Sequence, residues 1–151
     1  MAQQRLDEIR KVRIEKLEKL QEKGINPYPS TVAGKPLPIS DAQSKMGKKV
    51  GAVGRVMGWR GHGNVVFADL KDESGQIQLW FQKDNLKKNY ELVKLLDIGD
   101  FIYAEGEVTK TKAGETSIDV SKVQLLTKSI RPLPSTWYGL KDEEARYRQR
   151  Y

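Results

Sequence analysis

The sequence contains no cysteine and a single histidine, His62, among its 151 residues. The lack of cysteine excludes disulfides, thiolate metal sites and a cysteine nucleophile, and one histidine makes a histidine-based zinc centre implausible. No stretch approaches the roughly 18 apolar residues that a membrane-spanning helix needs, and the first residues lack the apolar core of a secretory signal. We therefore expect a globular, cytoplasmic protein.

The motifs on which most active sites are built are also missing. Segment 61–63 has two glycines around His62, but neither the third glycine nor the Lys-Ser/Thr pair of a phosphate-binding loop. There is no nucleophile elbow and no pair of carboxylates at a catalytic spacing. We expect no catalytic residue, no metal and no cofactor in these residues, and we interpret His62 as a turn residue rather than a general base.

Positive charge is present in excess, since 27 lysines and arginines stand against 20 acidic residues and give a net charge of +7. Such an excess favours polyanionic partners, chiefly nucleic acid or an anionic membrane surface. A basic surface without such a partner explains the charge equally well. The charge therefore needs a structural context before it indicates a function.

The first segment, residues 5–23, has the pattern of an amphipathic helix that Gly24 and Pro27 end. Its apolar residues recur at helical spacing: Leu6, Ile9, Val12, Leu17 and Leu20. We expect this stripe to pack on a domain or a partner while the charged residues stay in solvent, because glutamates dilute the basic face. The helix lacks the large aromatic anchors of a membrane-surface helix, so no membrane association is expected. We assign residues 1–24 to this N-terminal helix.

Residues 25–48 contain four prolines and are interpreted as a linker. Within them a short helix is predicted around residues 40–46, capped by Ser40 or Asp41. The linker separates the N-terminal helix from a region with a different hydrophobic period.

From residue 49 onward the hydrophobic period is two, as in β-strands. Strands are predicted over residues 49–60, 64–71, 76–81, 101–109 and 115–126, and a helix over residues 86–96. Gly54 or Gly58 should bend the first strand, and a bulge is expected near Ser121 in the last.

Three strands, a helix and two further strands form the order of an OB-fold, a five-stranded Greek-key barrel with an all-β core. Five-stranded barrels of the SH3 type do not place a helix between the third and fourth strands. We therefore assign residues 49–128 to an OB-fold barrel preceded by the N-terminal helix. Residues 129–151 form a link that ends in a short charged helix over residues 141–151.

Alternation along the second and third strands separates core from surface. Every second residue from Val66 to Leu70 faces the core, so Phe67 faces outward, as do Gln78 and Trp80 on the next strand. OB-folds bind ligands on these two strands. An exposed ring offers a stacking surface for a base, and a carboxamide offers a donor and an acceptor to the edge of a splayed base. The alternative is that Phe67 packs beneath the N-terminal helix or on a cross-strand neighbour.

Candidates for contacts with an RNA backbone lie on the first strand and in two loops: Arg55, Arg60, His62, Lys110 and Lys112. Strict alternation turns Arg60 inward, so its exposure requires a bulge at the Gly58 bend. Any single lysine in such a loop is more often solvated surface than a ligand contact.

Several motifs of the chain occur together in one known family. They are GRVM at 54–57, Arg60, VFADL at 66–70 and GQIQ at 75–78, with further matches at 5–10, 24–29, 137–142 and 146–151. This set resembles the anticodon-binding domain of class II lysyl-tRNA synthetases and extends over essentially the whole chain. The last two segments, WYGLKD and RYRQRY, favour the lysyl enzymes over the related aspartyl and asparaginyl enzymes.

The resemblance implies that the barrel binds the anticodon loop of a lysine tRNA with a UUU-type anticodon. In that family the aromatic residue that matches Phe67 stacks on the middle uridine. The amide that matches Gln78 pairs with the same base, and the arginine that matches Arg60 contacts the loop. The residues that read a neighbouring uridine are not matched, and Glu105 and Glu107 stay as candidates.

Members of the family continue through a dimeric catalytic domain that binds ATP, lysine and magnesium and attaches lysine to tRNA. The resemblance therefore implies that this chain is the anticodon-recognition part of such a homodimeric ligase and is inactive alone. Two alternatives stay open: a general module for single-stranded nucleic acid, and a protein-interaction domain whose basic surface is incidental.

Overall fold

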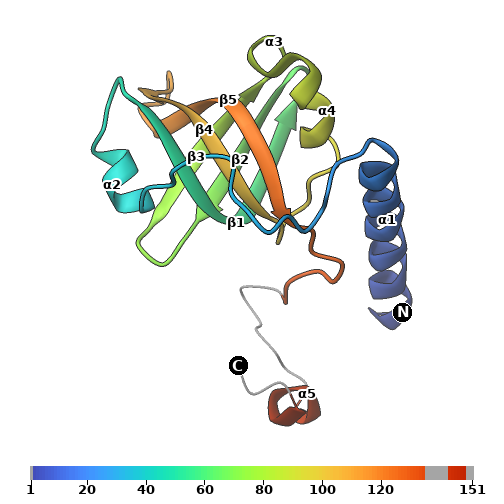
Figure 1. Cartoon of the computed structure of the whole chain (residues 1–151). Coiled ribbons are helices and arrows are strands. Elements are labelled where there is room, and N and C mark those ends of the chain that lie inside the picture. Colours follow the sequence, from blue (N-terminus) through green and yellow to red (C-terminus); the bar gives the residue numbers. More distant parts are fainter. Residues whose placement is uncertain (1, 135–142, 149–151) are drawn as a thin grey trace.

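A computed structural model of the chain describes residues 2–134 and 143–148, in which five strands form a closed barrel with the order β1-β2-β3-β5-β4 (Figure 1). The strands are β1 (Lys49–His62), β2 (Val65–Lys71), β3 (Gln76–Gln82), β4 (Phe101–Lys110) and β5 (Thr116–Thr127). Neighbouring strands are antiparallel except for the parallel pair β3–β5. This topology confirms the predicted OB-fold.

Irregularities in the strand register let the long strands curve around the barrel. The register of β1 against β2 shifts between Val56 and Gly58, at one of the two predicted bends. In β5 the register shifts where Glu105 and Gly106 face Lys122 and Val120, which leaves Ser121 as the extra residue of the predicted bulge. A Cβ on Gly106 would collide with the carbonyl oxygen of Asp119, so the close approach of β4 to β5 requires glycine there.

The barrel interior is filled by every second residue of the strands. Ala68 and Leu70 of β2 are fully buried, as are Leu79 and Phe81 of β3, which confirms the inward face predicted for these strands. Because the inward positions are apolar on both strands, the residues between them are held on the outer surface.

The predicted helix between β3 and β4 is broken into three pieces: α3 (Lys83–Leu86), the 3₁₀ helix η1 (Lys87–Asn89) and α4 (Tyr90–Val93). Lys87 has a φ of 49°, so the regular helical ladder cannot pass through it. The predicted apolar face is nevertheless buried, with Leu86, Tyr90, Val93 and Leu96 in the core.

The proline-containing segment 25–48 packs on the barrel more closely than a free linker would. Its helix α2 (Ile39–Gln43) is shorter than predicted, and the prediction that Ser40 or Asp41 caps it is wrong. The turn between β2 and β3 caps the helix instead: Asp72 Oδ2 accepts from the Ile39 N–H at 2.9 Å, and Ser74 Oγ accepts from the Ser40 N–H at 3.1 Å. Because Ile39 is fully buried, α2 becomes part of the core.

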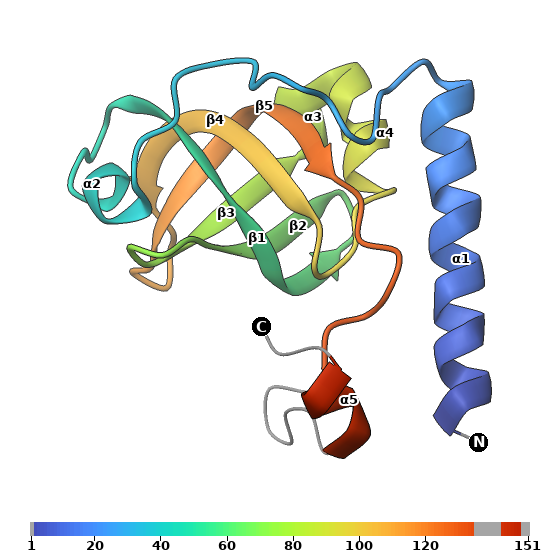
Figure 2. The ribbon, with the colours of Figure 1, turned by 60° about the horizontal axis from the view of Figure 1, so that its bottom comes forward.

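The N-terminal helix α1 (Ala2–Glu22) stands beside the barrel, opposite the side that carries α2 (Figure 2). Leu20 near its C-terminal end is fully buried, whereas Leu6 and Val12 are 45% and 50% exposed. The prediction of a packed apolar stripe is therefore wrong for Leu6 and Val12. No helix among the described residues is both long enough and apolar enough to span a membrane.

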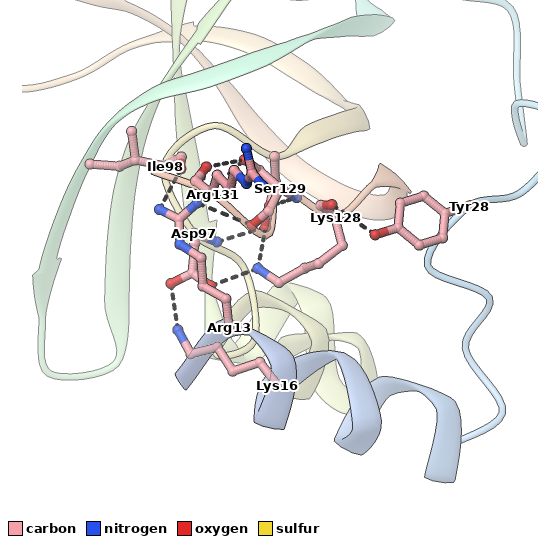
Figure 3. Close-up of polar contacts among 9 residues, drawn as sticks. Arg13, Lys16, Tyr28, Asp97, Ile98, Lys128, Ser129 and Arg131 are labelled. Carbon is pink, nitrogen blue, oxygen red and sulfur yellow. Dashed lines mark hydrogen bonds and ion pairs between the residues drawn. The ribbon is translucent and has the colours of Figure 1, made fainter. Parts of the chain in front are cut away.

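Polar residues attach α1 to the barrel (Figure 3). The Arg13 guanidinium, in a residue only 7% exposed, donates to the carbonyl oxygens of Ile98, Ser129 and Arg131 at 2.9, 3.1 and 3.1 Å. Lys16 Nζ forms an ion pair with Asp97 Oδ1 at 2.6 Å. The prediction that the charged residues of the helix are solvated is wrong for these two residues.

Lys128 lies next to this contact and is buried between two carboxylates. Its Nζ lies 2.6 Å from Asp97 Oδ2 and 2.8 Å from Asp100 Oδ2. Burial acts to raise the pKa of Asp97, but hydrogen bonds from Lys128 and Lys16 outweigh it and hold that pKa below its ordinary value. The cluster ties together α1, the segment before β4 and the chain that leaves β5.

Candidate nucleic-acid interface

Two aromatic rings lie next to each other on the outer surface of β2 and β3. Phe67 is the cross-strand partner of Trp80, and their ring centroids are 6.1 Å apart with an angle of 15° between the planes. Both side chains are partly exposed. The alternative that Phe67 packs on a cross-strand neighbour is thus realised, yet the pair still offers a flat apolar surface to a ligand.

The carboxamide of Gln78 lies beside this pair and is held at both ends. Its Nε2 donates to Glu115 Oε2 at 2.7 Å, and its Oε1 accepts from the Ser117 hydroxyl at 2.8 Å. An amide has two donors and two lone pairs, so one donor and one acceptor remain for a ligand.

The bulge in β1 brings Arg60 onto the same surface. Before the bulge, Val56 points into the core; beyond the shift at Gly58, Arg60 is exposed and lies opposite Phe67. Its guanidinium is 3.0 Å from Asp69 Oδ1 in an ion pair open to solvent. This neighbour holds the guanidinium over the sheet while leaving donors free.

The loop between β4 and β5 completes the site. A hollow of about 490 Å³ lies between this loop and the sheet, lined by Arg60, Phe67, Gln78, Trp80, Lys110, Thr111, Lys112, Ala113 and Glu115. Gly114, with a φ of 84°, allows the tight turn in which the Thr111 N–H donates to the Glu115 carbonyl. Within the part of the chain that the structure describes, the ammonium groups of Lys110 and Lys112 have neither a hydrogen bond nor an ion pair. The hollow is therefore apolar at its floor and cationic at its rim.

Five residues that the sequence singled out thus meet in one place: Arg60, Phe67, Gln78, Lys110 and Lys112. Arg55 does not line this hollow; its guanidinium carbon lies 4.6 Å from the centroid of the Phe101 ring. His62 ends β1, and its side chain lies outside the described part of the structure, as do the matched residues 137–142 and 149–151.

The two acidic candidates for reading a neighbouring base lie on β4. Glu105 pairs with Lys49 at 2.7 Å and accepts from the Tyr103 hydroxyl at 2.6 Å, and these hydrogen bonds hold its pKa below the ordinary value. Burial, with the hydrogen bond to Glu105, raises the pKa of Tyr103 to about 12. Glu107 is exposed. Neither acid lines the hollow beside Phe67.

Three residues of the site were not among those selected from the sequence. Trp80 was predicted to face outward but was given no role, and strand alternation was the signal for it. Glu115 and Ser117 reach Gln78 only because β5 runs parallel to β3 in the barrel. No local sequence pattern predicts the contact between Gln78 and Glu115, because the two residues lie 37 positions apart in the chain.

A larger hollow of about 710 Å³ lies between α1 and the barrel. Three of its charged groups are engaged in holding α1 to the barrel, because Lys16 binds Asp97 and Arg13 binds backbone carbonyls. Among the described residues no group of three or more histidine or acidic side chains is arranged to hold a metal ion. The hollow beside Phe67 has the better composition for a nucleobase, because it combines the flat surface of Phe67 and Trp80 with the carboxamide of Gln78.

Residues 50–126 match the family of OB-fold nucleic acid binding domains, and the chain belongs to that family. At closer range, it is similar to lysine–tRNA ligases. It is 47% identical over 150 residues to the lysine–tRNA ligase of Syntrophomonas wolfei and 46% identical over 144 residues to that of Moorella thermoacetica. The aligned parts cover 97% and 93% of this chain but 30% and 29% of the two ligases.

The lysine–tRNA ligase of Carboxydothermus hydrogenoformans is 43% identical over an alignment that covers all of this chain and 32% of that ligase. The similarity thus includes α1 and the segment beyond the barrel as well as the barrel itself. The chain spans about a third of the length of the curated relatives that it matches.

Proposed function

We propose that the surface formed by Phe67, Gln78 and Arg60 reads the anticodon loop of a lysine tRNA. The observation that carries the proposal is the stacked pair of Phe67 and Trp80 next to a carboxamide with one free donor and one free acceptor. A splayed base stacks on such a ring, and its edge is within the reach of the amide. The similarity to lysine–tRNA ligases supports lysine tRNA as the particular RNA.

The charges around the hollow support the same reading. Arg60 lines the hollow together with Lys110, the last residue of β4, and Lys112 in the loop that follows. Phosphate contacts by such groups position an RNA without reading its sequence, while the amide supplies the specificity. Each ion-paired phosphate releases counterions, so binding should weaken as salt is raised.

The role of the surface in a longer protein is part of the proposal. There it selects the tRNA to which a lysine–tRNA ligase attaches lysine, in the cytoplasm and as a homodimer. ATP and magnesium act in that reaction at residues outside this chain. By itself the chain recognises tRNA and supplies no catalytic group.

Two other functions lead to different binding behaviour. A general single-strand module binds any oligonucleotide with little sequence preference, and a protein-interaction domain shows no salt-dependent RNA binding.

One titration separates the three functions. The chain is titrated with a UUU anticodon stem-loop, a CCC-substituted stem-loop and single-stranded DNA, each at two salt concentrations. Anticodon recognition predicts salt-dependent binding with a clear preference for UUU. Equal affinity for all three ligands would instead support the general module, and no binding would contradict both nucleic-acid functions.

A further inference from the structure

The amide of Gln78 can serve as a specific reader only if it cannot turn over. A carboxamide that rotates by half a turn exchanges its donor and its acceptor at almost no change in shape. We infer that Glu115 locks this amide in one orientation and thereby makes the site accept uracil and reject cytosine. This inference rests on the proposed function.

The chemistry of the two partners of Gln78 shows why Glu115 is the lock. An ionised carboxylate only accepts hydrogen bonds, so the group that faces Glu115 Oε2 at 2.7 Å must be the amide nitrogen. If the amide turned over, its oxygen would face the carboxylate oxygen at the same distance, and two acceptors would repel each other. Ser117 imposes no such choice, because a hydroxyl rotates and either donates or accepts.

The position of the Glu115 carboxylate next to Gln78 is also fixed by the surrounding structure. The carbonyl oxygen of Glu115 accepts from the Thr111 N–H at 2.9 Å, which fixes the backbone at the foot of the loop. Ser117, two residues further along, is fully buried opposite Gln78 in the parallel pair of β3 and β5. The contact between Glu115 and Gln78 therefore depends on the barrel closure and not on a freely moving loop tip.

A fixed amide distinguishes the two pyrimidines by the order of its groups. Uracil presents an acceptor at position 4 and a donor at position 3, whereas cytosine presents a donor at position 4 and an acceptor at position 3. For a base held in one place by stacking on Phe67, uracil needs the amide nitrogen opposite position 4, and cytosine needs the oxygen there. An amide fixed in one orientation forms two hydrogen bonds with one of the bases. With the other base it places donor against donor and acceptor against acceptor.

The experiment compares two anticodon stem-loops, UUU and UCU, that differ only in the middle base. The parent chain should bind UUU at least about tenfold more tightly, since a two-hydrogen-bond pair discriminates by roughly 1–3 kcal/mol. Glu115→Gln keeps the size of the side chain but offers either a donor or an acceptor, so the amide of Gln78 can turn over. We expect this variant to gain affinity for UCU and to lose about fivefold or more of the preference.

Two matched variants isolate the effect. Ser117→Ala removes the other hydrogen bond of the amide but leaves the carboxylate, so the preference for UUU should persist even if both affinities fall. Glu73→Gln removes the same charge from an exposed residue in the turn between β2 and β3, outside the hollow. It should change the affinity for both stem-loops by the same factor and leave their ratio unchanged.

Each result decides a separate statement. A parent chain that discriminates, together with a Glu115→Gln variant that discriminates equally well, overturns the lock and leaves the proposed function standing. A parent chain that binds UUU and UCU equally overturns the proposed reading by Gln78 and the lock with it. Loss of the preference in Ser117→Ala but not in Glu115→Gln would assign the orientation to Ser117 and refute the role of the carboxylate.

Discussion

Phe67 contributes to the site through its partly exposed ring, which stacks on Trp80 and lines the hollow. Phe67→Ala should weaken binding of the UUU stem-loop by roughly 1–3 kcal/mol, or about ten- to a hundredfold, since one stacking surface is lost. The dependence of the binding constant on salt should stay nearly the same, because no phosphate contact is removed. Fluorescence titration at several salt concentrations measures both quantities.

A folded Phe67→Ala variant with the affinity of the parent would show that the ring serves only to pack on Trp80. Thermal unfolding of the variant is the control for folding. It should change little, because Phe67 lies on the outer surface of the barrel and not in the core formed by residues such as Ala68 and Leu79.

Arg60 acts at the same scale but through charge. Its ion pair with Asp69 is exposed, so Arg60→Ala should leave the free energy of unfolding almost unchanged. If the guanidinium meets a phosphate, the variant should bind the stem-loop more weakly and the salt slope should fall by about one. Filter binding across a salt series gives the slope.

Arg55→Ala is the matched control for Arg60, since it removes the same charge from the same strand. The guanidinium of Arg55 lies over the Phe101 ring and outside the hollow, so the salt slope should stay that of the parent. Equal losses of slope in both variants would indicate a general electrostatic effect of β1 and not a contact made by Arg60.

At the scale of elements, α1 is attached to the barrel by polar groups near its middle and by Leu20 near its end. Lys16→Ala should lower the free energy of unfolding by about 1–3 kcal/mol, because it leaves one oxygen of the partly buried Asp97 without its ion pair. Lys19→Ala is the control: Lys19 is exposed on the same helix and its ammonium makes no ion pair within the described residues.

Urea unfolding followed by circular dichroism measures both variants. Equal stabilities of Lys16→Ala and Lys19→Ala would mean that the contact with Asp97 does not hold the helix. The apolar stripe expected from the helical pattern does not predict this difference, because the pattern treats both lysines as solvated residues.

At the scale of the whole molecule, the cluster around Lys128 makes stability depend on pH. The pKa of Asp97 is lowered from the ordinary value of 3.8, so its contribution is fully present above that value and is lost as the pH falls through the lower value of the folded state. We expect the free energy of unfolding to decline as the pH falls below about 4.

The variant Asp97→Asn tests the origin of this decline. It should be less stable than the parent near neutral pH, because Lys16 and the buried Lys128 lose a charged partner. Its stability should then fall less steeply with acid, since the group whose pKa is lowered is gone. An acid decline as steep as that of the parent would assign the effect to other carboxylates, such as Glu105.

The sequence by itself determined the barrel and the outward position of its main binding residues. Alternation in β2 and β3 placed Ala68 and Leu70 inside and Phe67 and Gln78 outside, because the side chains of a strand alternate whatever the rest of the fold does. The sequence also predicted a bend at Gly54 or Gly58 and the bulge near Ser121. Strict alternation turned Arg60 inward, and the exposure of Arg60 depended on a bulge at Gly58 that the structure contains.

Only the tertiary structure decided which distant residues meet. It broke the helix before β4 at Lys87, buried Arg13 and Lys16 against the barrel, and brought Glu115 to the amide of Gln78. The contacts of Arg13, Lys16 and Glu115 depend on partners far away along the chain, whereas periodicity and capping signals report only on neighbours within a few residues. Barrel closure sets those partners, because the parallel pairing of β3 with β5 exists only once all five strands are in place.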